Sequence, residues 1–146
     1  MIQIHERAIR LNDLANKYAL DMRYTSAIEH YREALALYLH LAKEKPIFYG
    51  LHIAHVFSNL SAINLELNKF KRSEELYFNA LKMHRALAKH DFEKYGLGLG
   101  ICLVEGVQYL RQHTVILYEA EMVLSRIKGD YVCDELLDQI DTLRQN

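Results

Sequence analysis

The sequence predicts an all-α protein: an α-solenoid of three antiparallel helix pairs followed by a C-terminal capping helix. Three observations lead to this prediction. The 146-residue chain has one proline and six glycines, too few turn residues for a protein built of strands. Its apolar residues recur three and four positions apart, as they do on one face of a helix. A pattern of residues also repeats along the chain, which is typical of stacked helix pairs.

The spacing of the apolar residues, with the breaks between them, predicts seven helices. Thr25 or Ser26 is expected to cap the second helix, and Pro46 interrupts the pattern after it. Gly129 marks the break before the last helix, since glycine often terminates helices. The predicted helices cover residues 2–19, 25–43, 48–67, 71–88, 92–110, 114–127 and 131–145.

The repeat has a period of 46 residues. The run that begins at Tyr49 with Tyr-Gly-Leu recurs at Tyr95, 46 positions later. A two-helix unit cannot bury its apolar face alone and gains stability by stacking on its neighbours. We therefore predict one domain, 1–146, with repeats at about 2–45, 47–91 and 92–128 and a capping helix at 130–145. Further pairs at the same offset are Leu14 and Leu60, Tyr31 and Tyr77, Ala34 and Ala80, and Leu35 and Leu81.

The helix pairs resemble the tetratricopeptide repeat family, in its extended variety found in kinesin light chains and related bacterial proteins. That motif places small residues where the two helices of a pair approach, and Ala15, Ala27, Ser61 and Ser73 occupy those positions. Asn64 departs from the motif, which has tyrosine there. The third unit is degenerate. Other matching residues are Leu11, Leu14, Tyr18, Tyr31 and Ala34 in the first unit, and Phe57, Leu60, Tyr77 and Ala80 in the second.

The resemblance implies a concave groove, lined by the first helix of each pair, that binds a peptide or a helix of a partner protein. Asparagine side chains suit this task because they both donate and accept hydrogen bonds. Asn16 and Asn59 match the two asparagines of the family's carboxylate clamp, but Asn12 stands where the clamp has lysine, so a full clamp is not expected. The expected partner-binding residues are Asn12, Asp13, Asn16, His55, Asn59 and Glu66.

Composition argues against several other classes. The formal net charge is −1, whereas nucleic-acid binders usually carry a basic excess. No apolar run reaches the roughly 18 residues of a spanning helix, and the first residues lack the order of a signal peptide. We therefore expect a cytoplasmic protein without nucleic-acid or membrane partners. Cys102 and Cys133 are too few and too far apart for a disulfide framework.

Three features were considered as sites and set aside. His52 and His55 lie three apart and form half of a metal site, but no third ligand stands out. The glycine-rich run 96–100 sits in a helical pattern without the preceding strand of a phosphate loop, and close helix approach explains it better. Glu105 is a lone acid in an apolar stretch, more typical of local pairing than of catalysis.

The sequence thus predicts a non-enzymatic interaction scaffold with no metal, cofactor or catalytic residues. A possible homo-oligomer is the alternative, with the glycine-rich fifth helix or the terminal helix pairing with a second copy because a three-repeat array leaves its ends partly uncovered. A small-molecule or metal-dependent enzyme is a third reading, with the least support from spacing.

Overall fold

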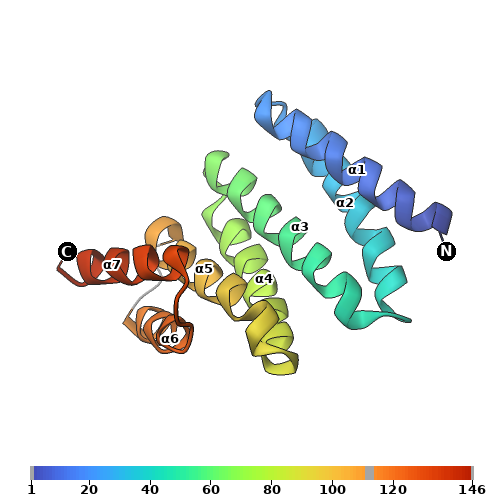
Figure 1. Cartoon of the computed structure of the whole chain (residues 1–146). Coiled ribbons are helices and arrows are strands. Elements are labelled where there is room, and N and C mark those ends of the chain that lie inside the picture. Colours follow the sequence, from blue (N-terminus) through green and yellow to red (C-terminus); the bar gives the residue numbers. More distant parts are fainter. Residues whose placement is uncertain (1, 111–113, 146) are drawn as a thin grey trace. The chain divides into compact units, whose positions relative to one another are not determined.

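The computed structural model describes residues 2–110 and 114–145, and within these ranges the chain forms seven helices and no strand (Figure 1). The all-α prediction is confirmed. Residues 111–113, which fall in the predicted third repeat, lie outside the described part. The helices are α1 (Ile2–Leu20), α2 (Tyr24–Ala42), α3 (Pro46–Glu66), α4 (Phe70–His90), α5 (Phe92–Leu110), α6 (Thr114–Ser125) and α7 (Tyr131–Gln145).

The helix ends agree with the prediction to within about two residues, but the expected cap of α2 is wrong. This helix begins at Tyr24 and its N-cap is Arg23, with no side-chain cap hydrogen bond, so Thr25 already lies in the first turn. Pro46 starts α3 rather than only interrupting the pattern. Proline suits a first helical position because the amide it lacks has no partner within the helix there.

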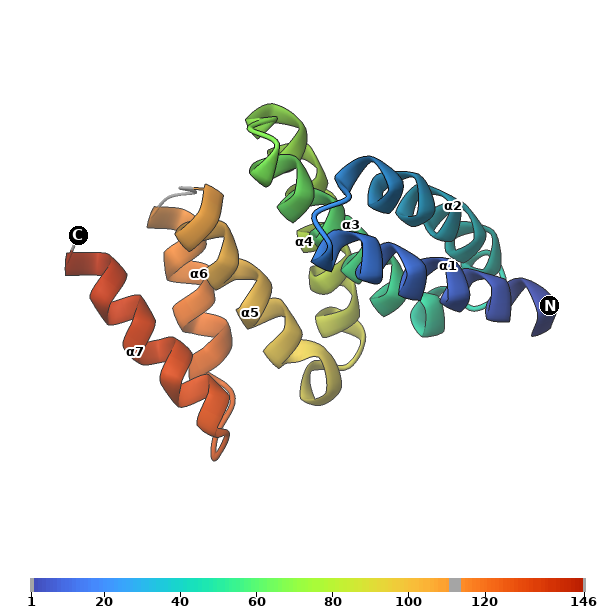
Figure 2. The same ribbon diagram turned by 90° about the horizontal axis from the view of Figure 1, so that it is seen from above.

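The chain divides into two compact units, Met1–Met83 and His84–Asn146, whose boundary falls inside α4. In the first unit α2 packs on both α1 and α3, and in the second α7 packs on both α5 and α6 (Figure 2). No helix in the described ranges has both the length and the apolarity to cross a membrane.

The 46-residue period is present in the backbone. Met22 and Asn68 have φ of 57° and 58°, and they lie 46 residues apart at the ends of α1 and α3. The amide of Arg23 donates to Tyr18 O at 2.8 Å, and the amide of Lys69 donates to Asn64 O at the same distance. Together with the bonds from Met22 to Ala19 and from Asn68 to Leu65, these form two equivalent Schellman turns. The backbone therefore has the same turn geometry at two points 46 residues apart, which is consistent with a helical repeat.

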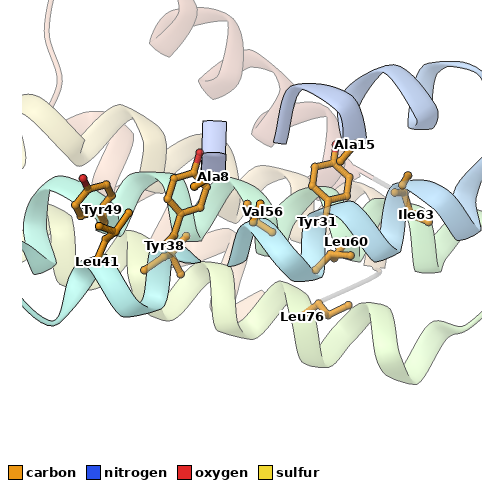
Figure 3. Packing of buried hydrophobic residues seen from close by; sticks show 13 residues of the cluster. Ala8, Ala15, Tyr31, Tyr38, Leu41, Tyr49, Val56, Leu60, Ile63 and Leu76 are labelled. Atoms are coloured by element: carbon orange, nitrogen blue, oxygen red, sulfur yellow. The ribbon is translucent and has the colours of Figure 1, made fainter. Parts of the chain in front are cut away.

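Alanines in α1 make room for the tyrosines of α2 in the core of the first unit. Ala8 and Ala15 have no exposed surface, and Figure 3 shows Tyr38 beside Ala8 and Tyr31 beside Ala15. Residues seven positions apart lie on the same side of a helix, two turns from each other. The two alanines of α1 and the two tyrosines of α2 have this spacing, so each alanine packs against one tyrosine. Small residues on one helix thus let large rings of the other fill the space between them.

The helices α3 and α4 approach closely where the sequence places two serines. Ser61 Oγ donates to Ser73 O and Ser73 Oγ donates to Ser61 O, both at 2.7 Å. Ser61 and Ser73 are 6% and 0% exposed. The predicted close approach at this pair is confirmed, and each buried hydroxyl has an acceptor on the opposite helix.

The second unit is held by close packing of α5 on α6 and by the buried face of α7. A Cβ added at Gly100 would lie 2.4 Å from Leu124 Cδ2, so only glycine fits there without movement. Cys133 and Ile140 of α7 are 0% and 1% exposed. Asp130 accepts a hydrogen bond from the Cys133 amide at 3.1 Å, which caps the start of α7.

Candidate functional site

The predicted partner-binding residues occupy two helices of the first unit. On α1, Asn12 and Asn16 are half-buried and Asp13 is exposed. On α3, Asn59 is half-buried, whereas His55 and Glu66 are exposed. All six thus keep some solvent contact, as a binding surface requires. No hydrogen bond joins Asn16 to Asn59 among the described residues, so the two helices meet through other side chains.

His5 and His52 make that connection. On a helix with 3.6 residues per turn, His5, Asn12 and Asn16 fall within about 40° of arc and form one stripe along α1. His52 and Asn59 share a stripe of α3 in the same way. The rings of His5 and His52 lie 6.4 Å apart. The stripes that carry the asparagines therefore meet at this end, and we call His5, Asn12, Asn16, His52, His55 and Asn59 the α1–α3 surface.

Two tyrosines of α2 lie beneath this surface. Tyr31 donates a hydrogen bond of 2.5 Å to Asn16 Oδ1, which orients that amide and leaves its NH2 as the group to offer a ligand. Tyr38 stacks on His52, with ring centroids 4.9 Å apart and an interplanar angle of 15°. Burial raises the pKa of both Tyr31 and Tyr38, and Asp13 further raises that of Tyr38. Both hydroxyls therefore stay protonated, as the hydrogen bond that Tyr31 donates requires.

Two histidines of the surface, His52 and His55, have lowered pKa values that favour their neutral form at pH 7. Burial lowers the pKa of His52 below its ordinary value, and the neighbouring His5 and His55 lower it further because like charges disfavour protonation. Desolvation also lowers the pKa of His55, although its side chain keeps more than a third of its surface exposed.

Two other features considered in the sequence, Glu105 and the glycine-rich run 96–100, lie on α5 in the second unit. Burial raises the pKa of Glu105 on α5, and no catalytic partner is assigned to it. A Cβ at Gly98 would lie 3.5 Å from His84 Nδ1, and Gly100 faces Leu124, so both glycines face side chains of this chain. No group of three His, Cys, Asp or Glu side chains that could hold a metal ion occurs within the described ranges.

Sequence reasoning missed His5 as a member of the α1–α3 surface, and it missed the rings packed against that surface, those of Tyr38, Phe48 and Tyr49. Tyr49 Oη and His5 Nδ1 share a hydrogen bond at 3.1 Å, across 44 positions of the chain. His5 and Phe48 stand at the starts of α1 and α3, and only knowledge of how these helices pack would bring them together. The aromatic residues near the start of α3 were the one signal in the sequence, and they were assigned to the repeat pattern.

Comparison with known proteins gives no further guidance, because no family model, no curated protein and no solved structure matches the chain.

Proposed function

We propose that this chain is a non-enzymatic scaffold of the tetratricopeptide type, in which α1–α2, α3–α4 and α5–α6 are antiparallel repeats and α7 is the cap. Its function would be to bind a peptide or helix of a partner protein on the α1–α3 surface. The observation that carries this proposal is the convergence of the two asparagine stripes at His5 and His52, above the tyrosines of α2.

The chemistry of the surface suits an extended backbone. Asn12, Asn16 and Asn59 each bring an amide that donates and accepts, and the amide of Asn16 is pre-oriented by Tyr31. A group held in its binding rotamer loses less entropy when a ligand arrives. His52 and His55, whose lowered pKa values favour the neutral form, add polar contacts without a net charge.

A peptide selection tests this function. We expect peptides selected from a displayed random library on the intact protein to lose affinity about tenfold or more for Asn16→Ala with Asn59→Ala, since two hydrogen-bonding partners are removed. The matched control is Gln3→Ala with Asn79→Ala, two exposed amides of the same unit outside the surface. Equal loss in both pairs, or none in the first, contradicts the groove assignment.

Self-association remains the second candidate, favoured by one observation on α6. Val115, Tyr118 and Met122 are 80%, 61% and 56% exposed and share one face of the helix. An exposed apolar face of this kind is typical of interaction sites. Light scattering over a concentration series tests it: a strict monomer at all concentrations rules out this function, and Tyr118→Glu should dissociate any oligomer that forms through α6.

A further inference from the structure

The exposed ring of Phe48 sits among aromatic side chains that leave one side of it open. Phe48 is 58% exposed, although it borders a packed aromatic cluster. The Phe48 centroid lies 4.9 Å from Tyr49 and 6.1 Å from both His5 and His52. These separations are within the 4.5–7 Å range of favourable ring pairs.

The rings around Phe48 are held in place from below. Tyr38, 1% exposed, stacks on His52, and Tyr49, 6% exposed, is hydrogen-bonded to His5. Figure 3 shows Tyr38 and Tyr49 in the packed layer of the core. The open side of Phe48 is therefore bordered by rings whose positions are fixed by packing, which lowers the entropic cost of adding another ring.

We propose that His5, Phe48 and His52 form a subsite for an aromatic side chain of the segment bound to the α1–α3 surface. This inference rests on the proposed function, because it names one side chain of the bound segment. Phe48 lies on the same stripe of α3 as His52 and Asn59, so a segment along the asparagines passes over the subsite. An added ring gains edge-to-face or stacked contacts with three rings.

The charge around the subsite favours an aromatic side chain over an acidic one. The titratable groups that face it are His5 and Asp13 from α1, Tyr38 from α2, and Tyr49, His52 and His55 from α3. At neutral pH the lowered pKa of His52 and His55 leaves these two uncharged, so an acidic side chain would find no cation in them. An aromatic ring needs none. Binding of an acidic side chain should therefore appear only in acid, whereas binding of a ring should already be present at neutral pH.

Small amides test the subsite directly, without a partner protein. N-acetyl-L-phenylalanine amide, N-acetyl-L-leucine amide and N-acetyl-L-aspartic acid α-amide are titrated into the full chain at about pH 7.5 and about pH 5.5. The histidine ring C–H signals are followed by NMR. We expect the phenylalanine amide to shift the His5 and His52 signals at the higher pH, where the aspartic acid amide should not. His30 of α2, whose ring contacts Tyr18, is the internal control.

Phe48→Ala should weaken the phenylalanine amide by about two- to tenfold, and Phe48→Tyr should retain its binding. Phe48→Ala is expected to fold, since the side chain is largely exposed. The proposal is overturned if the phenylalanine amide leaves His5 and His52 unshifted, or if the aspartic acid amide binds better at either pH. These readouts are independent of the asparagines. The peptide selection separates this inference from the proposed function. If the selected peptides depend on Asn16 and Asn59 but are not enriched in aromatic residues and do not depend on Phe48, the subsite is wrong and the proposed function is still supported.

Discussion

Met22 and Asn68 occupy the same left-handed backbone position 46 residues apart, yet they differ in how well they tolerate it. A side chain in this conformation brings Cβ close to the following carbonyl oxygen, at a cost of about 1–2 kcal/mol. Asparagine adopts it more readily than methionine, because its short polar side chain hydrogen-bonds locally. Met22 is 74% exposed, so packing offsets little of this cost. The first turn is therefore the more strained of the two.

Glycine at these positions should separate the two turns. We expect Met22→Gly to raise the free energy of unfolding by up to about 1 kcal/mol, because it relieves the left-handed conformation. Asn68→Gly should gain less. Urea unfolding followed by circular dichroism measures both. Ala36→Gly, at an exposed position inside α2, is the control and should lose about 1 kcal/mol. A loss for Met22→Gly as large as for Ala36→Gly contradicts the argument.

At the scale of the element, two neighbouring glycines of α5 have opposite surroundings. Gly98 has room for a methyl group at ordinary contact distance from His84, whereas Gly100 is closed off by Leu124. Leu124 has no exposed surface, so it cannot turn out into solvent to make room. Of these two glycines, Gly100 is required by packing, whereas Gly98 only lowers helix propensity.

Alanine at the two positions should therefore change stability in opposite directions. Gly98→Ala is expected to gain about 0.5–1 kcal/mol from helix propensity. Gly100→Ala should lose about 1–3 kcal/mol through overpacking against α6. Thermal and urea unfolding of both variants gives the comparison. A gain at Gly100 would mean that α6 moves away at little cost, and the close approach of α5 and α6 would not be tight.

The close contact of Ser61 and Ser73 between α3 and α4 also predicts how substitutions there change stability. Ala15 and Ala27 hold the corresponding positions in the first helix pair, and both have no exposed surface. Ser61→Ala with Ser73→Ala is therefore expected to cost no more than about 1 kcal/mol, because both hydrogen-bonding partners are removed together. Ser73→Leu should cost about 1–3 kcal/mol by overpacking. Equal stability of the two variants in urea would show that the crossing is loose, and Glu74→Leu, at an exposed neighbour, serves as the control.

For the whole molecule, the histidines of the α1–α3 surface link stability to pH. The pKa values of His52 and His55 are lowered in the folded chain, so the unfolded chain takes up protons first as the pH falls. Stability is therefore fully present above the unfolded pKa of about 6.5 and is lost as the pH falls through the lower folded values. We expect the urea midpoint to fall between about pH 7.5 and about pH 5.5.

His52→Gln with His55→Gln should flatten this dependence. His40→Gln, at an exposed position on α2, is the control and should leave the slope unchanged. If the double variant keeps the full slope, the acid sensitivity arises elsewhere in the chain.

The sequence was sufficient for the helices and the period but not for the site. Apolar spacing reflects burial along each helix, so the ends of all seven were close to those found. Asn12, Asn16 and Asn59 were expected from the resemblance to tetratricopeptide repeats, and their partner-binding role stays a prediction. The contact of His5 with Tyr49 depends on the packing of two helices that are distant in sequence, which no local pattern encodes. The hydrogen bond from Tyr31 to Asn16 was missed for the same reason, since the tyrosine was interpreted only as part of the repeat motif.

The two equivalent turns after α1 and α3 have a consequence for the length of the molecule. The segment from Arg23 to Asn68 begins and ends at matching points of the backbone. A second copy of this segment, spliced in after Asn68, would find the same turn geometry at both of its junctions. The chain could therefore be lengthened by duplicating residues 23–68, because both junctions of the inserted copy would repeat a turn that the protein already forms.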